Sequence, residues 1–138
     1  MDIAVQVWLR DGHVSQFRCD ENDEVLVQLI SGPYILALYA GAETGLKAAD
    51  DGTPYVSYPP ERFFGSQAIY YPEPMREAYA KNLKENGVDS FGMPYDFLIS
   101  EYSRKQDIAI FAAIPCLFEH IGEVSTGLAG FFHQAVRI

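Results

Sequence analysis

The run YILALYA, residues 34–40, constrains the fold of this chain more than any other stretch. It has the length of a β-strand and is apolar or aromatic at every position. Such a strand has to be covered on both faces, because neither face carries the alternating polar residues that water would favour. The sequence therefore predicts a sheet with packed material on both sides of this strand.

The remaining elements follow from hydrophobic period and turn residues. Asp11-Gly12 is typical of a tight β-hairpin, and Gly32-Pro33 ends the helix that follows it. The expected order of elements indicates a mixed α/β (α+β) fold with helices packed on a sheet. The predicted strands are 2–10, 13–19, 34–40, 55–58 at a sheet edge, 66–71 and 107–114, and the predicted helices are 20–31, 74–86 and 94–106.

The helix predicted at 74–86 has one apolar face. Met75, Tyr79 and Leu83 recur at helical spacing, which predicts that they pack on the core. The cations of this helix, Arg76, Lys81 and Lys84, fall outside that face.

Charge and hydropathy exclude several classes of partner. The 138 residues carry a net charge of −9, and their ten Lys and Arg form no cluster, so we expect no nucleic acid partner. No apolar run reaches the roughly 18 to 20 residues that span a bilayer, and the N-terminus lacks a signal-peptide pattern. We expect a single domain's hydrophobic core, no membrane span and a cytoplasmic location. Cys19 and Cys116 are too few and too far apart for a metal motif and are predicted to be buried thiols.

Acidic residues supply the first candidate for chemistry. Asp96 lies at the start of a predicted helix, and Asp89 lies in the glycine-bearing loop before it. A positioned carboxylate with a raised pKa is what a general base requires. Asp96 fits equally well a purely structural role near the positive end of the helix dipole, and the residues alone leave both open.

Two further acidic stretches raise the question of a metal site. His120 with Glu119 and Glu123 could bind a divalent cation, although an ordinary loop histidine explains the same residues. The pair Asp50-Asp51 lies in a stretch with turn residues and no buried strand before it, so a turn is the better interpretation.

The stretch FFGSQAIYYP places a glycine between aromatic residues just before a strand. Gly65 permits either a close approach of the backbone to a ligand or a simple turn, and Ser66 and Gln67 follow it. The surrounding tyrosines could stack on sugar rings, and core packing explains them equally well.

Taken together and in this order, FFGSQAIYYP, GVDSFGMPYDFLISEY and IPCLFEHIGEVSTG resemble the second half of glycosyltransferases with the A-type fold. The resemblance covers roughly residues 34–130. It implies that Gly65, with Ser66 and Gln67, belongs to a substrate-binding glycine loop. It also implies that Asp96, or else Asp89, is the catalytic base.

The same resemblance implies that His120 contacts a divalent metal (Mn²⁺ or Mg²⁺) or the donor diphosphate, and that Ser125 contacts substrate. The ligands it implies are a sugar acceptor or a sugar nucleotide. On this view residues 1–32 are an N-terminal extension, a β-hairpin plus helix, and residues 33–138 are the glycosyltransferase-like C-terminal half domain.

One departure from the family is important. Such enzymes have a nucleotide-binding half that ends in an acidic metal motif after a buried strand, and we expect that donor-binding half to be missing here. The acceptor-side half would then need a donor held by another polypeptide. The alternatives are a non-enzymatic glycan- or protein-binding module descended from that fold, with a protein partner or a homodimer at an exposed edge, and an unrelated α/β domain.

Overall fold

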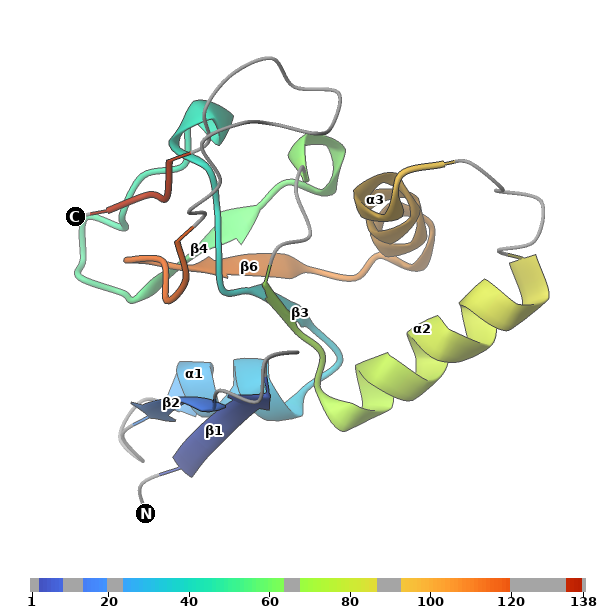
Figure 1. Ribbon diagram of the computed structural model, residues 1–138, viewed down its shortest axis with the longest axis horizontal. Helices are drawn as coiled ribbons and strands as arrows, with labels where there is room; N and C mark the ends of the chain where they lie inside the picture. Colours follow the sequence, from blue (N-terminus) through green and yellow to red (C-terminus); the bar gives the residue numbers. More distant parts are fainter. Residues whose placement is uncertain are drawn as a thin grey trace.

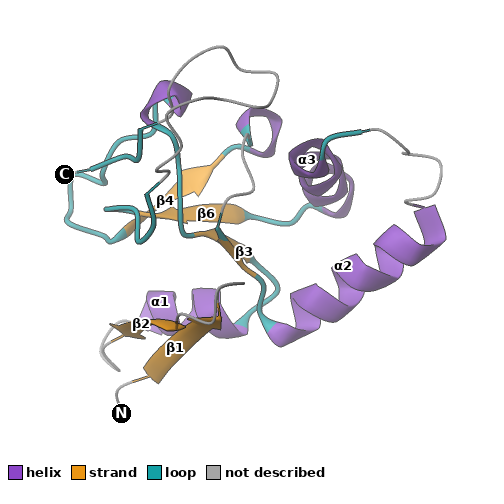
Figure 2. Cartoon of the chain, in the orientation of Figure 1, coloured by secondary structure: helices purple, strands orange, loops and turns teal. Residues whose placement is uncertain are grey.

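The computed structural model describes residues 3–8, 14–19, 24–63, 68–86, 93–119 and 134–137. They form a mixed α+β fold in which helices flank a four-stranded mixed sheet (Figures 1 and 2). The fold class expected from the sequence is thereby confirmed. The strands are β1 (Ile3–Trp8), β2 (Val14–Cys19), β3 (Ile35–Ala37), β4 (Tyr55–Tyr58), β5 (Ile69–Tyr70) and β6 (Ile110–Ala113). The helices are α1 (Glu24–Ser31), α2 (Glu73–Asn86) and α3 (Tyr95–Gln106), with 3-10 turns η1 (Ala42–Thr44) and η2 (Pro60–Arg62).

The main sheet has the strand order β4-β6-β3-β5. Its two central strands are parallel and pair in the register Ile35 with Ile110 and Ala37 with Ala112. β4 and β5 pair antiparallel on either side, so the predicted edge strand at 55–58 does lie at an edge.

β3 is covered on both faces, as its uninterrupted apolar sequence predicts. Ile35 and Ala37 belong to one buried cluster, and Leu36 and Leu38 to a second one on the opposite face. The regular ladder ends at Ala37, earlier than predicted, although residues 35–40 are all buried. Beyond that point the backbone bonds to irregular segments: Leu38 to residues 68, 117 and 118, and Ala40 to Val136.

The N-terminal hairpin forms a sheet of its own. β1 and β2 pair antiparallel, with Ile3 opposite Cys19 and Trp8 opposite Val14. α1 follows and packs on the main sheet through Ile30, which lies in the cluster with Leu36 and Leu38. The helix ends where predicted. A Cβ at Gly32 would lie 2.6 Å from the Gln28 carbonyl oxygen, so this close turn requires glycine.

α2 and α3 cover the sheet with few apolar residues. Met75 and Tyr79 of α2 are buried and Leu83 packs beside them, whereas Arg76, Lys81 and Lys84 are exposed, as predicted. α3 ends at Asp107, whose left-handed backbone (φ 53°) closes the helix. The predicted strand at 107–114 therefore starts later, at Ile110.

The long connection between β3 and β4 contains the predicted turn at Asp50-Asp51. The Asp51 carboxylate accepts hydrogen bonds from the Thr53 backbone N–H, at 2.9 Å, and from the Thr53 hydroxyl. Both bonds lower the pKa of Asp51, and the bond from the hydroxyl has the larger effect. The acidic pair thus serves turn formation, as predicted.

Cys116 is a free thiol, but it is half-buried and not fully buried as expected. Its Sγ accepts a hydrogen bond from the Ala40 N–H (3.1 Å) and donates to the Ala40 carbonyl (3.3 Å). The thiol thereby ties the end of the β3 run to the segment after β6. The side chain of Cys19 lies outside the described residues.

None of the helices in the described part of the chain is both long and apolar enough to span a membrane.

Candidate functional site

Asp96 is the one predicted site residue that falls within the described ranges. The other predicted site residues lie outside the described residues: Gly65, Ser66, Gln67, Asp89, His120 and Ser125. The geometry that bears on function is therefore that of Asp96 and of the described residues that border the other motifs.

Asp96 is the second residue of α3, one position after Tyr95. Its Oδ1 accepts a hydrogen bond from the Phe97 backbone N–H at 3.1 Å, and the side chain is half-buried. A carboxylate in the first turn of a helix is stabilised by the N–H groups that have no partner within the helix. The structure therefore places Asp96 at the helix start, where its side chain is partly open to solvent.

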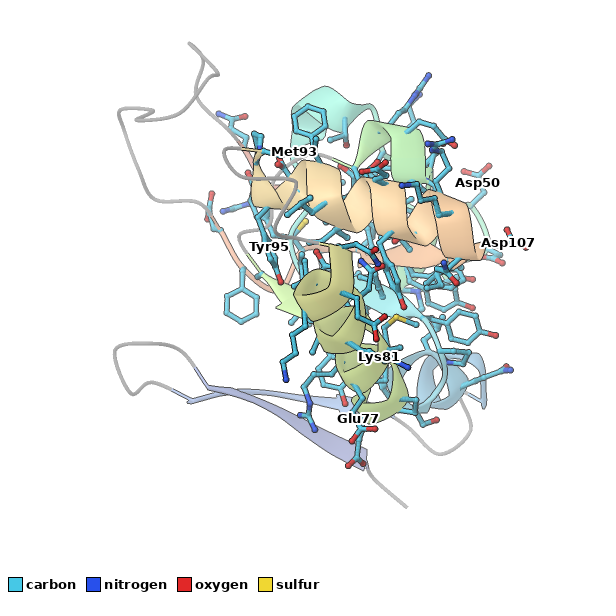
Figure 3. The ribbon with its side chains drawn as sticks, turned by 90° about the vertical axis from the view of Figure 1, so that its right-hand side faces the viewer. Asp50, Glu77, Lys81, Met93, Tyr95 and Asp107 are labelled. Carbon is cyan, nitrogen blue, oxygen red and sulfur yellow. The ribbon has the colours of Figure 1, made fainter. Side chains whose placement is uncertain are left out.

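The residues near Asp96 in the sequence include three with exposed apolar side chains. Met93 is 46% exposed, Tyr95 47% and Phe97 50%. Successive residues of a helix point about 100° apart, so Tyr95 and Phe97 flank Asp96 on its two sides. Figure 3 shows Met93 and Tyr95 at the starting end of α3 and Asp107 at the other end. The start of α3 thus combines aromatic surface with one acidic group.

Tyr95 also belongs to a group of four aromatic residues, Tyr71, Tyr79, Tyr95 and Tyr102, which we call the tyrosine cluster. Tyr79 is its centre. Its ring stacks on that of Tyr71 (centroids 5.7 Å apart, 8° between planes) and meets Tyr102 at 5.1 Å and Tyr95 at 6.1 Å. Because Tyr71 follows β5, Tyr79 lies on α2 and the others on α3, the cluster joins three elements of the fold.

Two hydroxyls of the cluster are buried and have no partner within hydrogen-bonding geometry. Neither the Tyr71 nor the Tyr79 hydroxyl has a partner of normal geometry. The Tyr95 hydroxyl is nevertheless close enough to interact with both. Burial first, and then the neighbouring Tyr95, raises the pKa of Tyr71 and of Tyr79. Burial also raises the pKa of Tyr102. These phenols are therefore neutral and able to donate at physiological pH.

Described residues near Gly65 and near His120 meet away from the tyrosine cluster. Leu38 donates its N–H to the Ala68 carbonyl (2.9 Å), and its own carbonyl accepts the N–H groups of Leu117 (2.9 Å) and Phe118 (3.3 Å). Ala68 is the first described residue after Gly65, and Phe118 lies two residues before His120. The described residues Ala68, Leu117 and Phe118 thus adjoin the carboxyl end of β3.

The tyrosine cluster lies toward the opposite end of β3. Tyr70 pairs with Leu36 in antiparallel register, so the chain at Tyr71 continues toward the amino end of β3, away from Leu38. Figure 1 agrees, with α3 near the start of β6 and the segment after Ala113 leaving from the other end of that strand. Two places are therefore defined, one around Asp96 and the tyrosine cluster and one around Leu38.

Glu119, expected as a possible partner of His120 at a metal, forms an ion pair with Arg137. Within the described ranges, no group of three or more His, Cys, Asp or Glu side chains is arranged to hold a metal ion.

The tyrosine cluster itself was not predicted as a site. Tyr79 was assigned to the core from helical spacing, and Tyr71 was noted only as part of an aromatic-rich stretch. Spacing along one helix does not show which rings from other elements will meet it. A signal that the sequence does offer is the recurrence of tyrosine, rather than phenylalanine, on the inner faces of both helices.

No family model, no curated protein and no solved structure matches this chain.

Proposed function

We propose that this chain is a glycosyltransferase-like domain that binds a sugar acceptor at the start of α3. The observation that carries the proposal is the half-buried Asp96, whose carboxylate accepts a hydrogen bond from the Phe97 N–H and which lies between the exposed residues Tyr95 and Phe97 in the sequence. A sugar ring has an apolar C–H face that stacks on aromatic rings and hydroxyls that donate to a carboxylate. Both requirements are met here within three consecutive residues.

In the enzymatic form of the proposal, Asp96 is the general base. An acceptor hydroxyl would transfer its proton to the carboxylate while its oxygen attacks the anomeric carbon of a donor sugar. The bond from that carbon to the diphosphate oxygen would break, and the nucleoside diphosphate would leave. The net charge of −9 gives this chain little to neutralise a diphosphate, so we propose that another polypeptide supplies the donor site.

A specific observation favours a second candidate, sugar binding without transfer. Leu117 and Phe118 bond to Leu38 at the carboxyl end of β3, whereas Asp96 lies on α3 beside Tyr95 of the tyrosine cluster. A base and a donor-binding histidine must reach the same reacting atoms. Because Phe118, two residues before His120, lies away from Asp96, this arrangement supports a glycan-binding module that retains only the acceptor contact.

Isothermal titration with methyl glycosides tests sugar binding at the start of α3, which the enzymatic and the non-enzymatic proposal have in common. We expect millimolar or tighter binding of at least one glycoside and a roughly tenfold loss in Asp96→Asn, because a hydrogen bond to a charged group is removed. Asp107→Asn is the matched control, since Asp107 is an exposed acid at the other end of α3 and asparagine tolerates its left-handed backbone. Absence of binding to every glycoside would refute the proposal.

Transfer assays then separate the two forms. The glycoside that binds is incubated with sugar nucleotides and Mn²⁺, and products are detected by mass spectrometry. Product that is lost in Asp96→Asn supports the enzyme. Binding without product, both with this chain alone and with cell extract as a source of the donor partner, supports the module.

A further inference from the structure

The buried hydroxyls of Tyr71 and Tyr79 are a polar feature that sugar binding at the start of α3 leaves unexplained. Tyr79 is only 3% exposed, and neither hydroxyl makes a proper hydrogen bond. A buried hydroxyl without a partner destabilises the folded state, because it has given up water and received nothing in return. Phenylalanine would pack in the same positions without that cost, so these two tyrosines favour a further partner beyond the described side chains.

Tyr95 shows where that partner would go. Its ring contacts Tyr79 edge-on at 6.1 Å, and after burial the neighbouring Tyr95 also raises the pKa of both buried phenols. The side chain is also 47% exposed, so little packing holds it in place. The Tyr95 hydroxyl thus occupies the position that a ligand oxygen could take if the side chain turned outward.

We propose that the tyrosine cluster is a subsite for the acetamido group of an N-acetylated sugar, with Tyr71 and Tyr79 donating to its carbonyl oxygen and Tyr95 as the movable cover. This inference rests on the proposed sugar binding next to it and names the class of sugar. The acceptor would be an N-acetylhexosamine, or a glycan that ends in one.

The chemistry of the cluster favours an acetamido group over other sugar substituents. A carbonyl oxygen has two lone pairs and can accept from both phenols at once. The methyl group of the acetamide is apolar and suits contact with aromatic rings such as those of Tyr79 and Tyr102, which pack on each other. A carboxylate fits less well, because the phenols are neutral and the chain carries a net charge of −9. A sugar hydroxyl would bring a donor of its own into a place that already has two.

Paired ligands and single-atom substitutions test the inference. The ligands are the methyl glycosides of N-acetylglucosamine and N-acetylgalactosamine, each compared with the parent hexoside. The variants are Tyr71→Phe and Tyr79→Phe, with Tyr70→Phe as the control because Tyr70 packs in the second cluster on the other face of the sheet.

We expect wild type to bind an N-acetylated glycoside more tightly than its parent. Each of the two test variants should weaken that binding roughly fivefold to tenfold, because one hydrogen bond is lost, and should leave hexoside binding unchanged. Their melting temperatures should stay the same or rise, since no bond is lost in the free protein. Tyr70→Phe should bind as wild type does.

Tyr95→Phe provides an independent arm that does not touch the buried hydroxyls. Removing its hydroxyl leaves the ring for stacking and removes the competitor of the ligand carbonyl, so affinity for the N-acetylated glycoside should rise several-fold. Unchanged or weaker binding in this variant contradicts the role of Tyr95 as a cover.

The outcomes separate this inference from the proposed function. Equal binding of N-acetylated and parent glycosides, or unaltered binding in both phenylalanine variants, would overturn the acetamido subsite and leave sugar binding intact. An internal water at the two phenols gives that same result. No binding of any glycoside would overturn both proposals.

Discussion

The central sheet and the tyrosine cluster differ in how completely their groups are satisfied. In the sheet, the parallel strands β3 and β6 bury aliphatic side chains such as Ile35 and Ile110, which are at most 1% exposed, and their backbone groups are paired. In the cluster, aromatic rings are packed just as closely, yet two hydroxyls lack proper partners. The comparison indicates that the sheet contributes mainly to stability, whereas the two phenols of the cluster are the groups to which we assign the proposed ligand contact.

The largest effect is expected from breaking the sheet side of this comparison. Ile110→Ala removes a fully buried side chain from a central strand and should lower the free energy of unfolding by about 2–5 kcal/mol. Urea denaturation followed by circular dichroism measures it. Leu117→Ala, at a residue that is 44% exposed, is the control and should change stability by less than about 0.5 kcal/mol. Similar losses in both variants would contradict the assignment of β6 to the core.

An intermediate effect is expected from alkaline pH, which acts on the cluster. The pKa values of Tyr71 and Tyr79 are raised in the folded state, so folding favours their neutral form. The stability that comes from keeping these phenols neutral is fully present below the pKa of tyrosine in the unfolded chain, about 10. It is lost as the pH rises from there toward the pKa values of the folded state. Urea denaturation at pH 8, 9.5 and 10.5 should show a decline above pH 10 that is smaller in the double variant Tyr71→Phe/Tyr79→Phe. An equal decline in that variant would show that other groups cause it.

The smallest effect is expected at an exposed hydrogen bond, the one between Thr53 and Asp51. It lies outside the tyrosine cluster and serves as a reference for the two buried regions. Thr53→Val removes the hydroxyl that donates to Asp51, so the pKa of Asp51 should rise toward its ordinary value. An NMR titration of the Asp51 carboxyl carbon measures the change. Thr53→Ser keeps a hydroxyl and should retain the lowered pKa. A pKa that stays low in the valine variant would mean that the backbone N–H of residue 53 is sufficient.

Much of the fold could be predicted because each element has a local signature. The apolar run at 34–40, the one-sided helix with Met75 and Tyr79, and the turn at Asp51 all depend on residues close together in sequence. The length of β3 could not be predicted, because the ladder stops where its partners become irregular, and those partners come from distant segments.

The site was less accessible to sequence reasoning. Asp96 was located correctly at a helix start, and its contact with the Phe97 N–H fits the structural role that the sequence left open beside the catalytic one. The meeting of Tyr71, Tyr79 and Tyr95 depends on how three elements pack, which no local pattern encodes. The resemblance to glycosyltransferases stays a prediction, because every site residue that it implies except Asp96 lies outside the described ranges.

The pairing of β3 with β6 has a consequence for how the protein reaches its native state. The two central strands are separated by residues 38–109, and the Cys116 thiol bonds to Ala40 across 76 residues of sequence. Contacts of such long range slow folding, because a large loop must close before they form. During synthesis β3 would have to wait for β6, with its apolar faces uncovered, so we expect this chain to fold late and to benefit from chaperones until residue 113 has left the ribosome.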